Sequence, residues 1–264
     1  MNSTPLTRPK VVLHNGDCLE IMRAMPDASF DLSIFSPPYN LSNSTGTGLR
    51  SPGSSKWKNC KLGQGYGSYT DDLPYAEYVK WQKAVLREVW RLTAHDGAIF
   101  YQHKTRIQAG RLQTPLELLP EELRDNLRQI VIWNRAGGFN FIRSFYLPTH
   151  EWIVILAKPA WRLKSKSGVK DVWAIKPARN NDHPAPFPVE LPQQAISTTA
   201  AKTIFDPFMG SGSTAIAALR EGRNFVGIEL DAGYFAKTVS RIEAEAKGTV
   251  DIIAHSLDLF KVAA

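Results

Sequence analysis

Four consecutive residues, Ser36-Pro37-Pro38-Tyr39, suit an exocyclic amino group on a planar base. The two prolines fix the backbone, so the Pro37 carbonyl is held rigidly, and Ser36 Oγ adds a second hydrogen-bond acceptor. Tyr39 offers a flat aromatic face on which a base can stack. Because most Pro-Pro turns are only structural, this interpretation depends on what else the chain contains.

A second segment, residues 205–214, has the composition of a nucleotide-binding turn. It lies between an expected strand and an expected helix, where glycines allow a tight turn and the first N–H groups of the helix can meet a ligand. Glu229 lies 19 positions after Gly210, at the end of the next expected strand, where a carboxylate can accept hydrogen bonds from ribose hydroxyls. The pattern indicates an adenosine-type cofactor; a tight connection with a surface acid is the structural alternative.

A dinucleotide-dependent dehydrogenase is another alternative, since Gly210, Gly212 and Ala215 also fit its looser glycine pattern. Only 35 residues follow Glu229, too few for the remaining strands of such a fold. The rest of the sheet must therefore come from the N-terminal part of the chain, and the cofactor turn near the C-terminus implies a permuted order.

Both turns need an α/β scaffold, and the hydrophobic pattern predicts one along the whole chain. The expected strands cover residues 11–14, 30–35, 98–101, 129–133, 152–157, 203–206 and 225–229. Helices are expected from Asp72 to about Val89, over 214–221 and over 232–246. The two functional turns would then leave the carboxyl ends of strands, which is where open α/β sheets bind ligands.

Residues 31–41 and 206–214 together resemble the catalytic and cofactor motifs of the amino-group DNA methyltransferases of bacteria and phages. The catalytic motif precedes the cofactor motif, which is the order of the β group. Residues 16–18, 183–188 and 226–231 also match, so the resemblance covers nearly the whole chain. It implies one domain over residues 1–264 with an α/β, Rossmann-like methyltransferase fold, a mostly parallel sheet, helices on both faces and a circularly permuted motif order.

The resemblance implies S-adenosyl-L-methionine as the cofactor, bound over the glycine turn. Glu229 would bind its ribose, Asp17 would lie near its adenine, and residues 183–188 would lie beside its methionine part. An ordinary loop histidine is an equal alternative for His183. The full set of expected cofactor residues is Asp17, Cys18, His183, Asp206, Pro207, Phe208, Gly210, Gly212, Ser213 and Glu229.

The same resemblance places a base, flipped from duplex DNA, at Ser36, Pro37, Pro38 and Tyr39. Its amino nitrogen is a poor nucleophile because the lone pair is delocalised into the ring. Two acceptors that draw this nitrogen toward tetrahedral geometry provide catalysis by orientation and electrostatics, so no covalent nucleophile is needed. Neither of the two cysteines is expected to act as one.

Serine before Pro-Pro-Tyr is more frequent in family members that make N4-methylcytosine, so the resemblance favours cytosine N4 and leaves adenine N6 open. Methyltransferases of RNA or of protein glutamine are alternatives, although they usually place the cofactor motif first. A DNA-binding relative without catalysis is a further alternative, against which the intact turns argue.

The net charge of +7 is concentrated in two segments. Residues 40–70 carry +4 and residues 158–179 carry +6, so the remainder carries −3. Few acids, together with Trp57, Trp161 and Trp173, favour contact with the DNA backbone or insertion into a groove over a solvated surface. The expected DNA-contacting residues are Arg50, Lys56, Lys58, Lys61, Arg135, Arg143, Lys164, Lys166 and Lys170.

A hydrophobic fraction of 43% excludes a disordered chain, and no apolar run reaches the length of a membrane span. Two cysteines cannot make a disulfide framework, and no spacing suggests a metal site. We expect a cytoplasmic monomer or homodimer, nucleoid-associated in a prokaryote or encoded by a phage. Its partners would be double-stranded DNA and, as a possibility of the family, a cognate restriction endonuclease.

Overall fold

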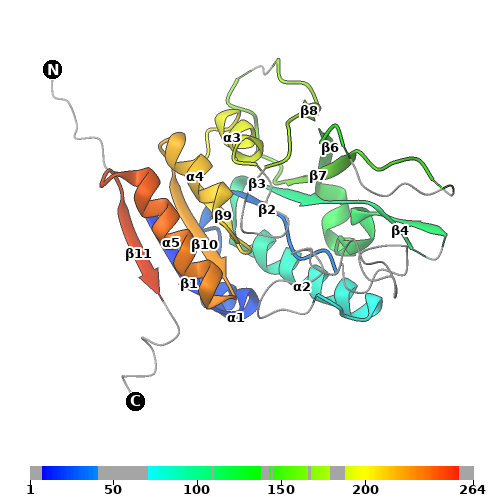
Figure 1. Ribbon diagram of the computed structural model, residues 1–264, viewed down its shortest axis with the longest axis horizontal. Helices are drawn as coiled ribbons and strands as arrows, with labels where there is room; N and C mark the ends of the chain where they lie inside the picture. The colour runs from blue at the N-terminus through cyan, green and yellow to red at the C-terminus, as the bar shows by residue number, and fades with distance from the viewer. Residues whose placement is uncertain are drawn as a thin grey trace.

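A computed structural model describes residues 8–40, 71–108, 110–137, 143, 145–165, 168–178 and 188–255. Its central feature is a nine-stranded sheet (Figure 1). In spatial order the strands are β11 (Asp251–His255), β1 (Lys10–Asn15), β10 (Asn224–Glu229), β9 (Thr203–Asp206), β2 (Phe30–Phe35), β3 (Thr93–His103), β7 (His150–Ala157), β6 (Leu127–Asn134) and β8 (Val172–Ala174). The first six are parallel, β7 is antiparallel to both of its neighbours, and β8 is parallel to β6.

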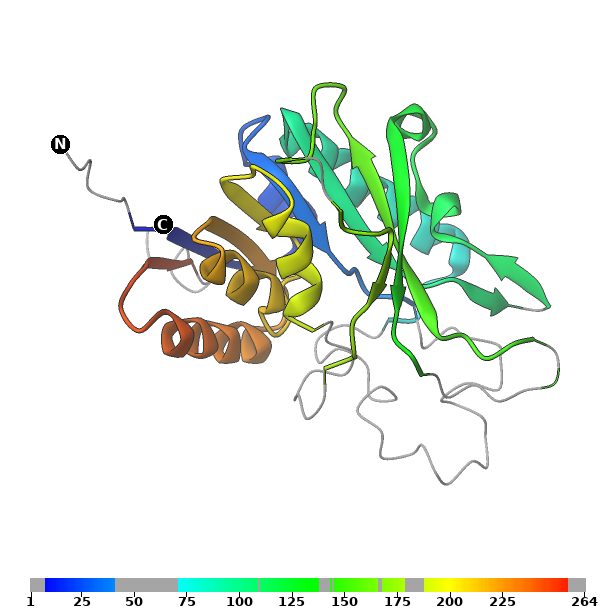
Figure 2. The ribbon, with the colours of Figure 1, turned by 90° about the horizontal axis from the view of Figure 1, so that it is seen from above.

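Helices cover both faces of this sheet (Figures 1 and 2). One face is covered by α3 (Glu190–Ser197), α4 (Ser213–Arg220) and α5 (Ala232–Ala246). The other is covered by α1 (Cys18–Arg23), α2 (Tyr75–Leu92) and the short 3-10 helices η3 (Pro115–Leu118) and η4 (Glu121–Asn126). Strands β9 and β10, late in the sequence, lie inside the sheet between β1 and β2, which are early in the sequence. The expected mostly parallel α/β sheet with a permuted order is confirmed.

Strand β2 shows why the sequence folds this way, because its side chains divide between two hydrophobic cores. Leu32 and Ile34 pack in the core under α3, α4 and α5, whereas Phe30 and Phe35 pack in the core under α1 and α2. The Phe30 ring stacks on that of Phe205 with centroids 4.3 Å apart. Burial on both faces fixes the register of β2, and with it the position where the strand ends.

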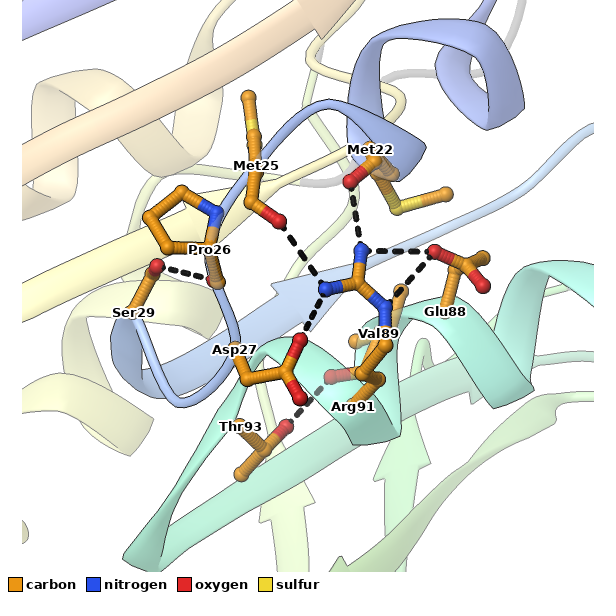
Figure 3. A network of polar contacts seen from close by, with 9 residues as sticks. All are labelled: Met22, Met25, Pro26, Asp27, Ser29, Glu88, Val89, Arg91 and Thr93. Carbon is orange, nitrogen blue, oxygen red and sulfur yellow. Dashed lines mark hydrogen bonds and ion pairs between the residues drawn. The ribbon is translucent and has the colours of Figure 1, made fainter.

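The guanidinium of Arg91, near the end of α2, joins α2 to the end of α1 (Figure 3). It donates to the Met22 carbonyl at 2.7 Å and the Met25 carbonyl at 3.0 Å. It also pairs with Glu88 at 2.8 Å and Asp27 at 2.5 Å. The Met22 carbonyl also accepts from the Met25 N–H at 3.0 Å, so Arg91 adds a second, charged donor at the end of α1 and holds this end against α2.

The basic segment 158–179 corrects one expectation. Trp173 lies in β8 and is 6% exposed, and Trp161 packs against the same core. The expectation that the indole ring is offered to DNA is wrong for Trp173, because that ring fills the sheet's hydrophobic core. For Trp161, which is only partly buried, it stays a prediction, and Trp57 lies outside the described residues. Helix α3, strands β8 and β11, and a hairpin of β4 (Arg106–Gln108) and β5 (Arg111–Gln113) were not expected. Within the described ranges, no helix is long and apolar enough to cross a membrane.

Candidate functional site

Two turns leave the same edge of the sheet side by side: residues 36–39, here named the catalytic turn for their expected role, and residues 207–212, here named the glycine turn. Strands β2 and β9 are parallel neighbours, with Ser33 opposite Phe205. Three residues further on, each strand has entered its turn, at Ser36 and at Phe208. The rings of Phe35 and Phe208 lie 5.9 Å apart, so the two turns also touch through their side chains.

The glycine turn depends on two residues with positive φ, Gly210 at 49° and Gly212 at 80°. A Cβ on Gly212 would lie 2.7 Å from Thr238 Cγ2, so helix α5 closes against the turn where only glycine fits. The Thr238 hydroxyl donates to the Gly210 carbonyl at 2.5 Å, and Arg241 donates to the Ser211 carbonyl at 2.6 Å. These contacts explain why the segment requires glycines at fixed positions.

Asp206 ends β9 with its carboxylate turned into the protein, where it is 1% exposed. One oxygen accepts from the Phe208 N–H at 2.9 Å, and the other accepts from the Thr214 hydroxyl at 2.7 Å. Burial raises the pKa of Asp206 to about 7, and the neighbouring Glu229 adds to the shift. Asp206 thus holds the turn in shape from inside.

Glu229 ends β10 as expected and closes the other side of the turn. Its carboxylate accepts from the Gly210 N–H and the Asp231 N–H, both at 2.9 Å. Each oxygen keeps a lone pair for a further donor such as a ribose hydroxyl. Burial raises the pKa of Glu229. The Glu229 carbonyl accepts from the Gly16 N–H at 2.9 Å, which connects this site to the start of α1.

The remaining expected cofactor residues line the same edge. Asp17 is the N-cap of α1 and accepts from the N–H groups of Leu19 and Glu20 at 2.9 and 3.0 Å. Cys18 is buried, and burial raises the pKa of its thiol, which keeps it protonated. Pro207 and Ser213 are buried at either end of the glycine turn. His183 lies outside the described residues.

The catalytic turn is fixed by hydrogen bonds on both sides. The Pro38 carbonyl accepts from the Tyr78 hydroxyl at 2.8 Å, so Pro37 remains the expected acceptor for a substrate. Asn40 has a φ of 56°, and its N–H donates to Asp71 at 2.6 Å. Arg106 donates to the Asn40 carbonyl at 3.1 Å. These contacts hold the backbone of residues 36–40 without a regular element.

Tyr39 is 7% exposed and its hydroxyl lies among buried polar groups. The Ser36 hydroxyl lies 2.7 Å from it, Gln102 Oε1 lies 2.5 Å from it, and Glu151 Oε2 lies 3.2 Å from it. The Tyr39 ring lies 4.7 Å from that of His103, with Lys104 Nζ 5.6 Å from its centroid. The ring expected to stack on a base is therefore anchored through its hydroxyl end.

Three polar residues that sequence reasoning missed lie around Tyr39, two at its hydroxyl and one over its ring. Gln102 in β3 is opposite Ile153 in β7, so Glu151 is its diagonal neighbour, and the side chains of Gln102 and Glu151 are hydrogen-bonded. Lys104 follows β3, and burial lowers its pKa to about 8, while Glu151 acts in the opposite direction. The available signal was Gln102 and Glu151 at the ends of otherwise apolar strands, where a buried polar side chain needs a partner.

The expected DNA-contacting residues fall into three groups. Arg135 was expected on DNA, but the structure places it in an ion pair with buried Glu151 at 3.0 Å. Arg143, Lys164 and Lys170 are exposed. Arg50, Lys56, Lys58, Lys61 and Lys166 lie outside the described residues.

A glycine turn, with a carboxylate at the end of the next strand, lies beside a rigid Ser-Pro-Pro-Tyr turn, which is the arrangement expected of an S-adenosylmethionine-dependent methyltransferase. The chain belongs to the N6/N4 family of DNA methylases, whose profile matches residues 30–240. The expected family, architecture and cofactor are therefore confirmed, and the protein is a DNA methyltransferase of the amino-group family. In the part of the chain that the structure describes, no group of three metal-ligating side chains forms a metal site.

Two curated relatives span most of the chain. The type II methyltransferase M.BglII of Bacillus subtilis is 26% identical, covering 88% of this chain and 70% of its own length. The type II methyltransferase M.ScaI of Streptomyces caespitosus is 25% identical, covering 90% and 83%. These coverages show that the similarity extends along most of the chain and is not confined to one motif.

Two solved structures share the fold. TTHA0409 of Thermus thermophilus, complexed with S-adenosyl-L-methionine, has a TM-score of 0.64 at 22% identity and covers 92% of this chain and 99% of its own. The cytosine-N4-specific PvuII DNA methyltransferase has a TM-score of 0.66 at 18% identity and covers 92% and 97%. At these identities the likeness concerns the fold.

Proposed function

We propose that this enzyme methylates the N4 amino group of a cytosine flipped out of duplex DNA. The observation that carries the proposal is the Ser36 hydroxyl, held at the carboxyl end of β2 beside the glycine turn of β9. Ser36 Oγ and the Pro37 carbonyl would accept the two hydrogens of the amino group. Tyr39 would lie beside the base, and orientation of the nitrogen would supply most of the rate enhancement.

The residues present fit S-adenosylmethionine, which supplies an electrophilic methyl group when bound. The glycine turn would hold it with Asp206, Pro207, Phe208, Gly210, Gly212 and Ser213. The second lone pairs of Glu229 would bind the ribose, and Asp17 with Cys18 would border the adenine. The half-buried Glu229 carboxylate accepts from two backbone N–H groups, which orients its remaining lone pairs for such a donor. His183 is proposed beside the methionine part.

We further propose that this enzyme serves in a restriction-modification system. The support is that its relatives M.BglII and M.ScaI are type II methyltransferases. Its substrate is double-stranded DNA, contacted by the basic segments 40–70 and 158–179. Arg143, Lys164 and Lys170 are exposed and available for phosphates. Methylation by this enzyme would then protect one recognition sequence from a cognate endonuclease.

The test is methylation of unmodified genomic DNA in vitro, followed by hydrolysis and mass spectrometry of the nucleosides. We expect N4-methyldeoxycytidine, and sequencing of the product to show one recognition sequence. N6-methyldeoxyadenosine as the product would overturn the choice of base. Methylation of RNA or protein in place of DNA would overturn the substrate class.

A further inference from the structure

The proposed reaction requires the Ser36 hydroxyl to accept a hydrogen bond from the target amino group rather than donate one. A serine hydroxyl has one hydrogen and two lone pairs, so it can either donate or accept. The target amino nitrogen must attack with its lone pair. Acceptors for its two hydrogens increase the electron density on the nitrogen, whereas a donor would compete for the lone pair. A Ser36 hydrogen that pointed at the amino group would oppose the reaction. A hydrogen-bond acceptor on the other side of Ser36 must therefore hold this hydrogen.

A chain of buried hydrogen bonds leads away from Ser36 to a carboxylate. Ser36 Oγ lies 2.7 Å from the Tyr39 hydroxyl, which lies 2.5 Å from Gln102 Oε1. The Gln102 amide nitrogen in turn contacts Glu151 Oε2. Tyr39, Gln102 and Glu151 are each less than a tenth exposed, so water does not compete for these bonds.

The carboxylate determines the direction of every bond in this chain. An ionised carboxylate only accepts, so Gln102 must turn its NH2 group toward Glu151 and its Oε1 toward Tyr39. Gln102 Oε1, at 2.5 Å, and Glu151 Oε2, at 3.2 Å, both accept from Tyr39, so the tyrosine donates its single hydrogen on this side, mainly to the nearer Gln102, and keeps its oxygen as an acceptor for Ser36. Ser36 donates its hydrogen to that oxygen, and its lone pairs are left for an incoming donor.

Arg135 keeps the other end of the chain fixed. Its guanidinium lies 3.0 Å from Glu151 Oε1, while Gln102 contacts Oε2, so the two oxygens have different partners. Lys104, also close to this site, adds a second positive charge to the surroundings of Glu151. The ion pair with Arg135 therefore fixes the Glu151 carboxylate in place and leaves Oε2 to accept from Gln102.

We propose that Glu151 is a positioning residue, acting through Gln102 and Tyr39 to hold Ser36 as a hydrogen-bond acceptor for the target amino group. This inference rests on the proposed role of Ser36 in methyl transfer, whichever base is methylated. In Glu151→Gln the new amide gives the chain a second donor. The Gln102 amide can then flip and donate to Tyr39, which would donate to Ser36 and turn the Ser36 hydrogen toward the substrate.

The kinetic test is a double-mutant cycle of Glu151→Gln and Tyr39→Phe, read as the single-turnover rate of methyl transfer to unmodified genomic DNA. We expect Glu151→Gln to slow transfer roughly tenfold or more, as removal of polar stabilisation at a reacting centre does, with unchanged affinity for S-adenosylmethionine and DNA. In the Tyr39→Phe background, where the chain is cut, Glu151→Gln should add little. An unchanged rate in Glu151→Gln, or the same loss in both backgrounds, would overturn the proposal.

Two further variants separate this effect from packing. Glu122→Gln, which breaks an exposed ion pair with Arg87, is the matched control and should transfer methyl groups at the wild-type rate. Gln102→Leu should be milder than Glu151→Gln, because Tyr39 lies 3.2 Å from Glu151 and can donate to it directly. If Gln102→Leu slows methyl transfer more than Glu151→Gln does, packing of Gln102 against Tyr39 matters more than the direction of the hydrogen bonds, and the proposal fails.

Neutron diffraction from deuterated wild-type crystals tests the inference without any reaction. We expect the Tyr39 deuterium between Tyr39 and Gln102 and the Ser36 deuterium between Ser36 and Tyr39. A Tyr39 deuterium directed at Ser36 would overturn the proposal even if the enzyme is active. Failure of wild-type enzyme to methylate DNA would instead contradict the proposed function, so the two failures are distinct.

Discussion

Asp206 and Thr214, at opposite ends of the glycine turn, are joined by a 2.7 Å hydrogen bond from the Thr214 hydroxyl to the Asp206 carboxylate. The same carboxylate accepts from the Phe208 N–H, so it defines the turn from strand to helix. Because it is buried, its charged form is costly and its pKa is raised to about 7. The group that shapes the cofactor turn therefore titrates near neutral pH.

This shift makes the stability of the free enzyme depend on pH. The folded pKa of Asp206 is about 7, above its ordinary value of 3.8, so folding favours the protonated form. Its stabilising contribution is fully present below about pH 4 and is lost as the pH rises through 7. In Asp206→Asn this part of the pH dependence should disappear, which thermal unfolding at pH 5 to 8 can measure. Asp125→Asn, an exposed control, should keep the wild-type profile; equal profiles for Asp206→Asn and wild type would contradict the assignment.

Gly212→Ala should destabilise the protein beyond the cost of an unfavourable φ alone. The added Cβ would meet Thr238 Cγ2 at 2.7 Å, and φ is +80°. Gly222 has a φ of +65° with nothing within 4 Å of a Cβ, so Gly222→Ala measures the backbone cost by itself. We expect a loss of about 1 kcal/mol in the free energy of unfolding for Gly222→Ala and about 2–4 kcal/mol for Gly212→Ala in urea titrations. Equal losses for the two variants would show that Thr238 of α5 moves away from the new Cβ at no cost, which would contradict the prediction.

The central strands were predictable from the sequence because each carries its own local signals. Pro37 and Pro38 end β2, and the glycines after Asp206 end β9. Helix α3 was missed because Pro188 and Pro192 make its sequence look like a loop, although proline is tolerated in a first helical turn. Strand β8 was missed because its three residues lie within a basic segment, where only the burial of Trp173 indicates a strand.

The two turns of the site could be recognised because each is contiguous in sequence. The polar chain behind Ser36 could not, since Gln102 and Glu151 come from strands paired far apart along the chain. Their contact depends on the register of β3 against β7, which no local pattern determines. The same reason explains Arg135, whose charge suggested DNA but whose partner is Glu151.

Arg91→Ala should lower the free energy of unfolding without changing cofactor affinity. Removal of the guanidinium takes a charged donor from the Met22 and Met25 carbonyls. It also removes the cation that pairs with both Asp27 and Glu88. We expect a loss of about 2–3 kcal/mol, since charged hydrogen bonds to helix-end carbonyls are involved. Arg87→Ala, which breaks only an exposed pair with Glu122, should cost less than about 1 kcal/mol. Chemical denaturation decides this, and similar losses for both variants would contradict the structural role of Arg91.

Ser36→Ala should slow methyl transfer by roughly 10²-fold, the size seen when one stabilising polar group is removed from a reacting centre. Affinity for S-adenosylmethionine should stay at the wild-type value in calorimetry, because the proposed cofactor contacts belong to the glycine turn. Ser240→Ala, at an exposed position of α5, is the control and should leave the rate unchanged. A Ser36→Ala enzyme with wild-type turnover would remove Ser36 from the reaction.

Lys164 and Lys170 should contribute to DNA affinity through phosphates rather than bases. Both are exposed in the basic segment 158–179, where Trp173 is buried in the core, so we expect the segment to contact DNA mainly through charge. Each Lys→Ala change should weaken DNA binding similarly for all sequences and reduce the slope of log K against log salt by about 1 for each phosphate that is no longer neutralised. Lys80→Ala, at an exposed position of α2, provides the control for an equal change of net charge. If Lys80→Ala reduces the salt slope as much as Lys164→Ala does, net charge alone explains binding, and segment 158–179 has no special place on DNA.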